Sequence, residues 1–333
     1  MNQVVRFASL SALCIFIVSQ ESLGQGSLDP PGPPGPIYKT LDEVKPGTPI
    51  TSLPFTIATS GSYYLTQSVT GQSGSHGIVV TAANVTLDLH GFTLKGVPGS
   101  LTGITVQGGQ NIAIINGVIR DWGENGISAG VSDGRFENLM IWNNGLAGLT
   151  AGDGVVIRNC QSRLNQNGAG FTSGSECVLE NCVAKNNSGG PGFGFGGSSV
   201  LKNCIAFSNA SFGFSGFGAS GMSLERCVAR SNEGTGFSLG SEVTCTACIA
   251  KGNNGHGFDS SGSSMTNCIA DSNDNNGFDC FESVILGCLA TDNAIGFRLD
   301  KGLLKNSVGA GNGTDIVLSG TPTIAVGIDN WED

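Results

Sequence analysis

Residues Asn181-Cys182-Val183-Ala184, followed downstream by Gly192-Phe193, form one copy of a pattern that recurs about every twenty residues. A fixed period of this length indicates a solenoid, in which no repeat buries its apolar face without its neighbours. The repeated cysteines are Cys160, Cys182, Cys204, Cys227, Cys248, Cys268 and Cys288, and the Gly-Phe steps end at Phe171, Phe193, Phe214, Phe237, Phe258, Phe278 and Phe297.

The residue types exclude a helical solenoid. The chain has 53 Gly and is rich in Asn, Ser, Thr and Val, which break or disfavour helices. Within one period, short apolar runs such as Val200-Leu201 and Cys204-Ile205-Ala206 alternate with Asn, Ser and Gly turn residues. The pattern predicts an all-β chain with three short strands in each coil.

These repeats resemble the right-handed parallel β-helix family with the pectate-lyase-like fold, in particular its secreted bacterial members with Asn-Cys-x-Ala coils. The resemblance covers roughly residues 53–318, because degenerate coils extend back through Gly148-Leu149, Gly126-Ile127, Gly103-Ile104 and Gly77-Ile78. It implies a right-handed parallel β-helix of about ten to eleven coils, each of roughly 20–23 residues.

The sequence predicts three consecutive segments, beginning at the N-terminus. Residues 1–24 carry Arg6, an apolar run and small residues, the pattern of a secretory signal peptide. Residues 25–52 form a Pro-rich linker, and residues 53–333 form the β-helix with an N-terminal cap. Because no run approaches twenty apolar residues, we expect no membrane span and a mature protein that is secreted, periplasmic or on the cell surface.

The charge balance narrows the class of partner. The formal net charge is −10, so neither nucleic acid nor an anionic membrane is expected as the main partner.

The repeated cysteines should stack as small buried side chains, and their parallel directions suit free thiols better than disulfides. Cys245 and Cys248 have the CxxC spacing of a metal site, but no second pair or nearby His completes one. Asparagines beside each strand predict hydrogen-bonded structural ladders at the coil corners.

The position three residues after each ladder cysteine, or its equivalent, predicts an outward row of basic and aromatic residues. Such a row suits an extended acidic polysaccharide, with cations meeting carboxylates and rings meeting sugar faces. A solvated outer face explains the same residues, and both interpretations stand. The candidate polysaccharide-binding residues are Arg120, Trp142, Arg163, Lys185, Phe207, Arg230 and Lys251, after which the row reads Asp271.

The same alternation turns an apolar row outward. If it holds, Val183, Ile205, Val228, Ile249, Ile269 and Leu289 all face away from the core. Either a terminal segment or a partner covers this row, or the alternation is wrong.

A second candidate site follows the repeated phenylalanines. Asp259, Asp279 and Arg298 come directly after Phe258, Phe278 and Phe297, and Asp300 lies two residues further. Stacked carboxylates can hold calcium or act as an acid/base pair beside an arginine. The resemblance implies the same kind of group, since lyases of this fold use calcium-binding acids with a basic proton acceptor. A structural ladder of ion pairs is the alternative interpretation.

Two functions therefore compete. The first is a non-catalytic β-helix that binds polysaccharide or forms part of an envelope or surface assembly, and it needs no cofactor. The second is a lyase or related enzyme acting on an acidic uronate polysaccharide, with Asp259 and Asp279 as acid/base or calcium groups and Arg298 as base or carboxylate clamp. Gly255-His256-Gly257 looks like a polygalacturonase signature, but the two glycines belong to the repeat and the companion motifs are absent.

Overall fold

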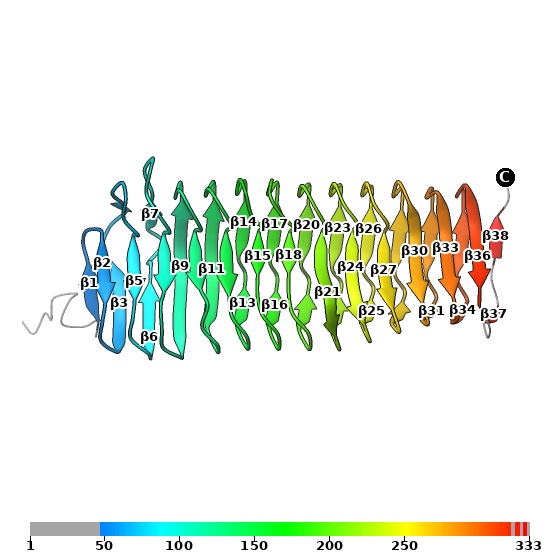
Figure 1. Cartoon of the computed structure of the whole chain (residues 1–333), viewed down its shortest axis with the longest axis horizontal. Helices are drawn as coiled ribbons and strands as arrows, with labels where there is room; N and C mark the ends of the chain where they lie inside the picture. The colour runs from blue at the N-terminus through cyan, green and yellow to red at the C-terminus, as the bar shows by residue number, and fades with distance from the viewer. Residues whose placement is uncertain (1–46, 321–323, 327–328, 332–333) are drawn as a thin grey trace, which may run out of the picture. The chain divides into compact units, whose positions relative to one another are not determined.

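The computed structural model describes residues 47–320, 324–326 and 329–331 of the chain. The predicted signal peptide and most of the predicted linker lie outside these residues. Every regular element in the described part is a β-strand, and all strand pairs are parallel, so the predicted all-β solenoid is confirmed (Figure 1). The first strand, β1 (Thr48–Ile50), pairs with β3 (Gly61–Leu65), so the stacked strands begin inside the segment assigned to the linker.

Each coil contributes strands to three ladders, which we call A, B and C. Ladders A and B form one sheet of 25 strands, in which β9 and β11 belong to both, and ladder C forms a sheet of 13 strands. The 13 strands delimit about 12 turns, slightly more than the ten to eleven expected.

Ladder A contains β1 (Thr48–Ile50), β3 (Gly61–Leu65), β6 (Val85–Asp88), the first parts of β9 (Ile112–Arg120) and β11 (Arg135–Trp142), β13 (Val156–Arg158), β16 (Val178–Glu180), β19 (Val200–Lys202), β22 (Ser223–Glu225), β25 (Thr244–Thr246), β28 (Ser264–Thr266), β31 (Val284–Leu286), β34 (Leu303–Lys305) and β37 (Ile324–Val326). Ladder B contains β4 (Val69–Thr70), β7 (Thr93–Lys95), the second parts of β9 and β11, β14 (Gln161–Arg163), β17 (Val183–Lys185), β20 (Ile205–Phe207), β23 (Val228–Arg230), β26 (Ile249–Lys251), β29 (Ile269–Asp271), β32 (Leu289–Thr291), β35 (Val308–Ala310) and β38 (Asp329–Trp331). Ladder C contains β2 (Phe55–Ile57), β5 (Ile78–Val80), β8 (Ile104–Val106), β10 (Ile127–Ala129), β12 (Leu149–Ala151), β15 (Phe171–Thr172), β18 (Phe193–Gly194), β21 (Phe214–Ser220), β24 (Phe237–Ser241), β27 (Phe258–Ser261), β30 (Asn276–Phe281), β33 (Ile295–Asp300) and β36 (Thr314–Ser319).

The corner between ladders A and B depends on left-handed backbone geometry. Asn159, Asn181 and Asn203 have φ angles of 52°, 55° and 52°. Asparagine accepts this geometry more readily than most residues because its short side chain bonds locally. The expected corner role of these asparagines is confirmed.

The asparagines that follow the ladder B strands form a buried ladder at the corner between ladders B and C. Each side chain donates from Nδ2 to Oδ1 of the equivalent asparagine in the next coil, as in Asn187 to Asn209 at 2.9 Å and Asn209 to Asn232 at 3.0 Å. The same Oδ1 atoms also accept the backbone N–H of the preceding asparagine. The corner polar groups are thus satisfied without water, as buried polar groups require.

A stack of seven phenylalanine rings fills the core beneath ladder C. Neighbouring centroids lie 4.7–5.2 Å apart and the planes are within 13° of parallel. The glycine before each ring allows this spacing: a Cβ on Gly213 would lie 2.6 Å from the carbonyl oxygen of Gly236. Only glycine therefore fits at this repeated step.

The ten cysteines of the described residues are free and buried, as the sequence predicted for the ladder. Burial raises the pKa of the Cys204 and Cys280 thiols well above the ordinary range. Cys245 is fully buried and pairs in register with Leu224 on ladder A, so it is a core residue.

The predicted alternation of inward and outward side chains along the ladder B strands is confirmed. The alanine at the middle of each ladder B strand from β17 to β32, such as Ala184 or Ala206, is fully buried, and its flanking residues point outward. The apolar row from Val183 to Leu289 therefore faces outward, and its members are half-buried except Ile205, which is 41% exposed.

Candidate functional site

The predicted basic and aromatic residues form one continuous outward row on ladder B, which we call row B. Each member is the strand partner of the next, from Arg120 through to Lys251 and Asp271. The register adds Lys95, which pairs with Arg120 and extends the row by one coil. The sequence search missed Lys95 because its coil has Gly91 four residues earlier, where the coils of Arg120 and Trp142 have Asn116 and Asn138.

The two rings of row B lie between cations. The guanidinium carbons of Arg120 and Arg163 lie 5.1 Å and 5.2 Å from the centroid of Trp142. Lys185 Nζ and the Arg230 guanidinium carbon lie 5.1 Å and 5.9 Å from the centroid of Phe207. Because the neighbouring cations occupy the ring faces, the rings hold the cations in register and do not offer open faces for sugar stacking.

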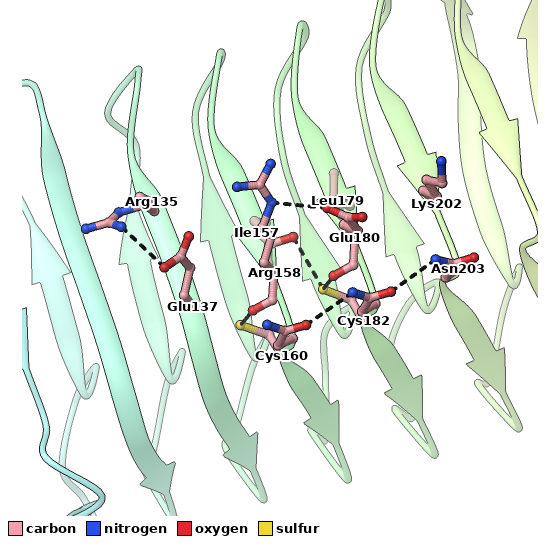
Figure 2. Close-up of polar contacts among 12 residues, drawn as sticks. Arg135, Glu137, Ile157, Arg158, Cys160, Leu179, Glu180, Cys182, Lys202 and Asn203 are labelled. Atoms are coloured by element: carbon pink, nitrogen blue, oxygen red, sulfur yellow. Dashed lines mark hydrogen bonds and ion pairs between the residues drawn. The ribbon is translucent and has the colours of Figure 1, made fainter.

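A second charged row lies on ladder A, and the sequence analysis did not identify it. It runs Glu137, Arg158, Glu180, Lys202 and Glu225 in strand register. Opposite charges alternate and pair, with Arg158 Nε 3.2 Å from Glu180 Oε2 and Lys202 Nζ 3.0 Å from Glu225 Oε2. Figure 2 shows Glu137, Arg158, Glu180 and Lys202 of this row, with the corner residue Asn203 beside Lys202. This row is a structural ladder of exposed ion pairs, each worth little stability.

Row B differs because its cations lack acidic partners. Of the Lys and Arg side chains in the described residues, eight make an ion pair. The five without one are Lys95, Arg163, Lys185, Arg230 and Lys305, of which all but Lys305 lie on row B. In addition, the buried Nε atom of Arg163 has no hydrogen-bond partner.

Acidic residues flank the three central unpaired cations of row B, Arg163, Lys185 and Arg230. Arg120 bonds to Asp121, whose other oxygen accepts a 2.7 Å hydrogen bond from Asn143. At the other end, Lys251 pairs with Asp271. Partial burial pushes the pKa of Asp271 upward, but hydrogen bonds from Lys251 and Ser272 and the Lys251 charge outweigh it, so the pKa is lowered.

The second predicted cluster lines a groove on ladder C. Asp259, Asp279 and Arg298 are strand partners in consecutive coils, and with Asp300 they line a groove of about 550 Å³. Arg298 Nη1 lies 2.9 Å from Asp279 Oδ1, so this arginine pairs with the middle carboxylate. The structure thus brings the three predicted residues together.

The groove carboxylates have different surroundings. Burial raises the pKa of Asp259 above its ordinary range; His256 opposes the increase and the Asp279 charge adds to it. Asp279 contacts Arg298, accepts a 3.1 Å hydrogen bond from Asn276, and lies 3.6 Å from His256 Nε2. His256 thus belongs to the group, although its sequence position gave no reason to select it.

The surroundings of Asp279 do not suit calcium. Calcium takes six to eight oxygen ligands in proteins. Here both oxygens of Asp279 already contact Arg298, and within the described residues no group of three or more His, Cys, Asp or Glu could hold a metal ion. The calcium role of Asp259 and Asp279 stays an untested prediction, and we derive no chemistry through it.

Row B and the groove lie on different sheets. Row B lies on ladder B, and the groove carboxylates Asp259 and Asp279 lie on ladder C. The two candidate sites predicted from sequence therefore do not form one continuous surface strip, and row B does not lead residue by residue into the groove.

The family defined by the right-handed β-helix region matches residues 56–198, 168–295 and 196–324. The chain belongs to this family. No curated protein sequence gives a significant match. Among the described residues, no helix is long and apolar enough to cross a membrane.

Several solved structures share the fold of this β-helix protein. The A-module of mannuronan C-5 epimerase AlgE6 from Azotobacter vinelandii is 12% identical with a TM-score of 0.53, covering 86% of this chain and 90% of that one. The bacteriophage Phi29 gene product 12 N-terminal fragment is 12% identical with a TM-score of 0.53, over 82% and 65%. The Dettilon tailspike protein is 13% identical with a TM-score of 0.52, over 83% and 61%. At these identities the likeness shows the fold alone.

Proposed function

We propose that the protein is a non-catalytic module that binds an extended acidic polysaccharide along row B. The observation that carries this proposal is the concentration of unpaired cations: four of the five in the described residues lie on one row of a chain whose net charge is −10. Like charges on neighbouring strands repel, so the arrangement costs stability unless a polyanion neutralises it. The fully paired row on ladder A shows that the same scaffold accommodates compensated charges.

A linear polymer fits the geometry of row B. Parallel strands repeat at about 4.8 Å, so cations on successive coils form an evenly spaced line. The cation–ring contacts preorganise these side chains and reduce the entropy lost on binding. One structure with the same fold is named as a mannuronan epimerase, which agrees with a polysaccharide ligand but assigns no residue role here.

We place the mature protein outside the cytoplasm, in the periplasm or at the cell surface, because residues 1–24 have the pattern of a signal peptide and a polysaccharide ligand is found there. Free thiols are compatible with this location, since all ten cysteines of the described residues are buried from oxidants.

Binding should be measured by isothermal titration with polygalacturonate, alginate and a neutral glucan. The decisive variant is Arg163→Gln/Lys185→Gln/Arg230→Gln. The matched control is Arg135→Gln/Arg158→Gln/Lys202→Gln on ladder A, which removes the same number of charges. We expect binding to the acidic polymers alone, weakened by about tenfold or more, about 1.4 kcal/mol, in the row B variant. Equal losses in both variants would show that general charge, not row B, determines binding.

The groove supports a second candidate function, a lyase or related enzyme acting on a uronate polysaccharide. The favouring observation is that Asp259 and Asp279 share one groove but differ in surroundings. Two carboxylates in different surroundings can divide the roles of proton donor and acceptor. In β-elimination the acceptor removes the proton beside the uronate carboxylate, the new double bond expels the glycosidic oxygen, and the donor protonates it. Arg298 would clamp the substrate carboxylate.

Ultraviolet absorbance during incubation with uronate polymers detects the unsaturated sugar that elimination creates. A rise that is lost in both Asp259→Asn and Asp279→Asn would establish the lyase. No rise with a polymer that binds by titration would leave the non-catalytic module as the function.

A further inference from the structure

Row B contains a central block of unpaired cations, bounded on each side by a cation that is paired with a carboxylate. The block spans four consecutive coils and contains Arg163, Lys185, Phe207 and Arg230, in that order. Its three cations make no ion pair in the described residues, and at about 4.8 Å per coil the block is about 14 Å long. The nearest cations outside the block are Arg120, one coil beyond Trp142, and Lys251, next to Arg230, and each is already paired with a carboxylate. The unpaired Lys95 lies one coil beyond Arg120, outside the block.

The closing carboxylates are held in place. Asp271 bonds to Lys251, Ser272 and Thr291 and is 21% exposed. Asp121 bonds to Arg120 and Asn143 and is also 21% exposed. A ligand of up to six units that extended past the block would meet Trp142 or a cation already paired with a fixed carboxylate, so its added acidic units gain nothing. The unpaired Lys95 comes into reach only at a seventh unit, counted from Arg230.

Within the block, the third position carries no charge. Phe207 separates Lys185 from Arg230 by two coil spacings, about 9.6 Å, and both cations lie over its ring. A ligand unit opposite Phe207 therefore has no cation of its own, whereas units opposite the other three members each do.

We infer that row B recognises a four-unit segment of acidic polysaccharide, with acidic groups required at its first, second and fourth units and not at its third. The inference rests on the proposed function and adds the length and charge pattern of the ligand. The extended hexopyranose unit is comparable in length to one coil spacing of about 4.8 Å, so one sugar faces each coil. Asp121 and Asp271 set the two limits of the site.

The first test uses oligogalacturonates of two to six units, measured by titration at fixed salt. We expect affinity to change little from two to three units, because the third faces Phe207, to rise at four units, and then to change by less than about twofold up to six. Asp271→Asn releases Lys251, which adds one cation to the block, so the plateau should move from four units to five. Glu180→Gln, which removes a carboxylate from the ladder A row, is the matched control and should leave the plateau at four.

The second test uses tetramers in which one inner carboxyl is methyl-esterified. One inner position should tolerate the ester within about twofold, and the other should lose about tenfold, because only one inner unit faces a cation. Equal effects at both inner positions, or affinity that keeps rising to six units, would overturn the four-unit pattern while leaving polysaccharide binding intact. Absence of binding to both oligomers and polymer would instead remove the proposed function itself.

Discussion

Replacing one member of the buried asparagine ladder should cause a large and local loss of stability. In Asn232→Ala, four hydrogen bonds disappear: Oδ1 no longer accepts from N and Nδ2 of Asn209 at 3.0 Å each, and Nδ2 no longer donates to Asn253 Oδ1 at 2.9 Å or Ala206 O at 3.2 Å. At about 1 kcal/mol for each buried bond, the free energy of unfolding should fall by about 4 kcal/mol.

The matched control is Asn181→Gly at the exposed corner. Asn181 also bonds to its neighbours, at 3.3 Å to Asn159 and 3.1 Å from Asn203, but water replaces those bonds and glycine accepts its φ of 55°. We expect a loss below about 1 kcal/mol.

Urea unfolding followed by circular dichroism measures the midpoint and slope for both variants. Hydrogen exchange adds a local readout, because the Asn209 amide loses its acceptor in Asn232→Ala and should exchange faster. If Asn232→Ala lost no more stability than Asn181→Gly, the ladder would not be a determinant of stability and the reasoning would be refuted.

Three further predictions concern the core and the two charged surfaces. Because burial raises the pKa of Asp259, native protein binds this proton more tightly than unfolded chain; stability should fall as pH rises from about 3.9 through the raised native value, and Asp259→Asn should flatten that fall in urea titrations across pH. The ten buried thiols should react with Ellman's reagent only when urea unfolds the chain, and rapid reaction of the native protein would show that the core opens. Arg158→Gln should lower the free energy of unfolding by less than about 1 kcal/mol because its partner Glu180 lies at the surface, and a loss of several kcal/mol would contradict this assignment.

The repeat made much of the fold predictable from the sequence. Once Cys182 and Cys204 are aligned, Lys185 aligns with Phe207, and a turn one residue shorter in the second coil then brings Phe193 into line with Phe214. Period-two alternation then assigns inward and outward faces. The coil register, the core ladders and the members of row B from Arg120 to Lys251 follow from these two rules.

Contacts between side chains were less predictable. Alignment placed Trp142 beside Arg120 and Arg163 but could not show that these cations cover its ring, because that depends on rotamers. His256 reaches Asp279 from a turn, and turn conformation has no repeat rule. The charged row on ladder A is visible in the sequence, because the residue directly before each of the first three Asn-Cys blocks alternates in charge. It was missed because that position was not compared between coils.

Each coil contributes a single residue to row B, and the neighbouring coils contact one another through nearly identical inner ladders. A duplicated coil inserted between β17 and β20 should therefore splice into the stack without redesign of its core. It would add one more position to the outer row, and the identity of one residue would decide whether that position is charged or neutral. The length of the outer row can therefore be changed by counting coils, and its charge can be set one residue at a time without touching the core.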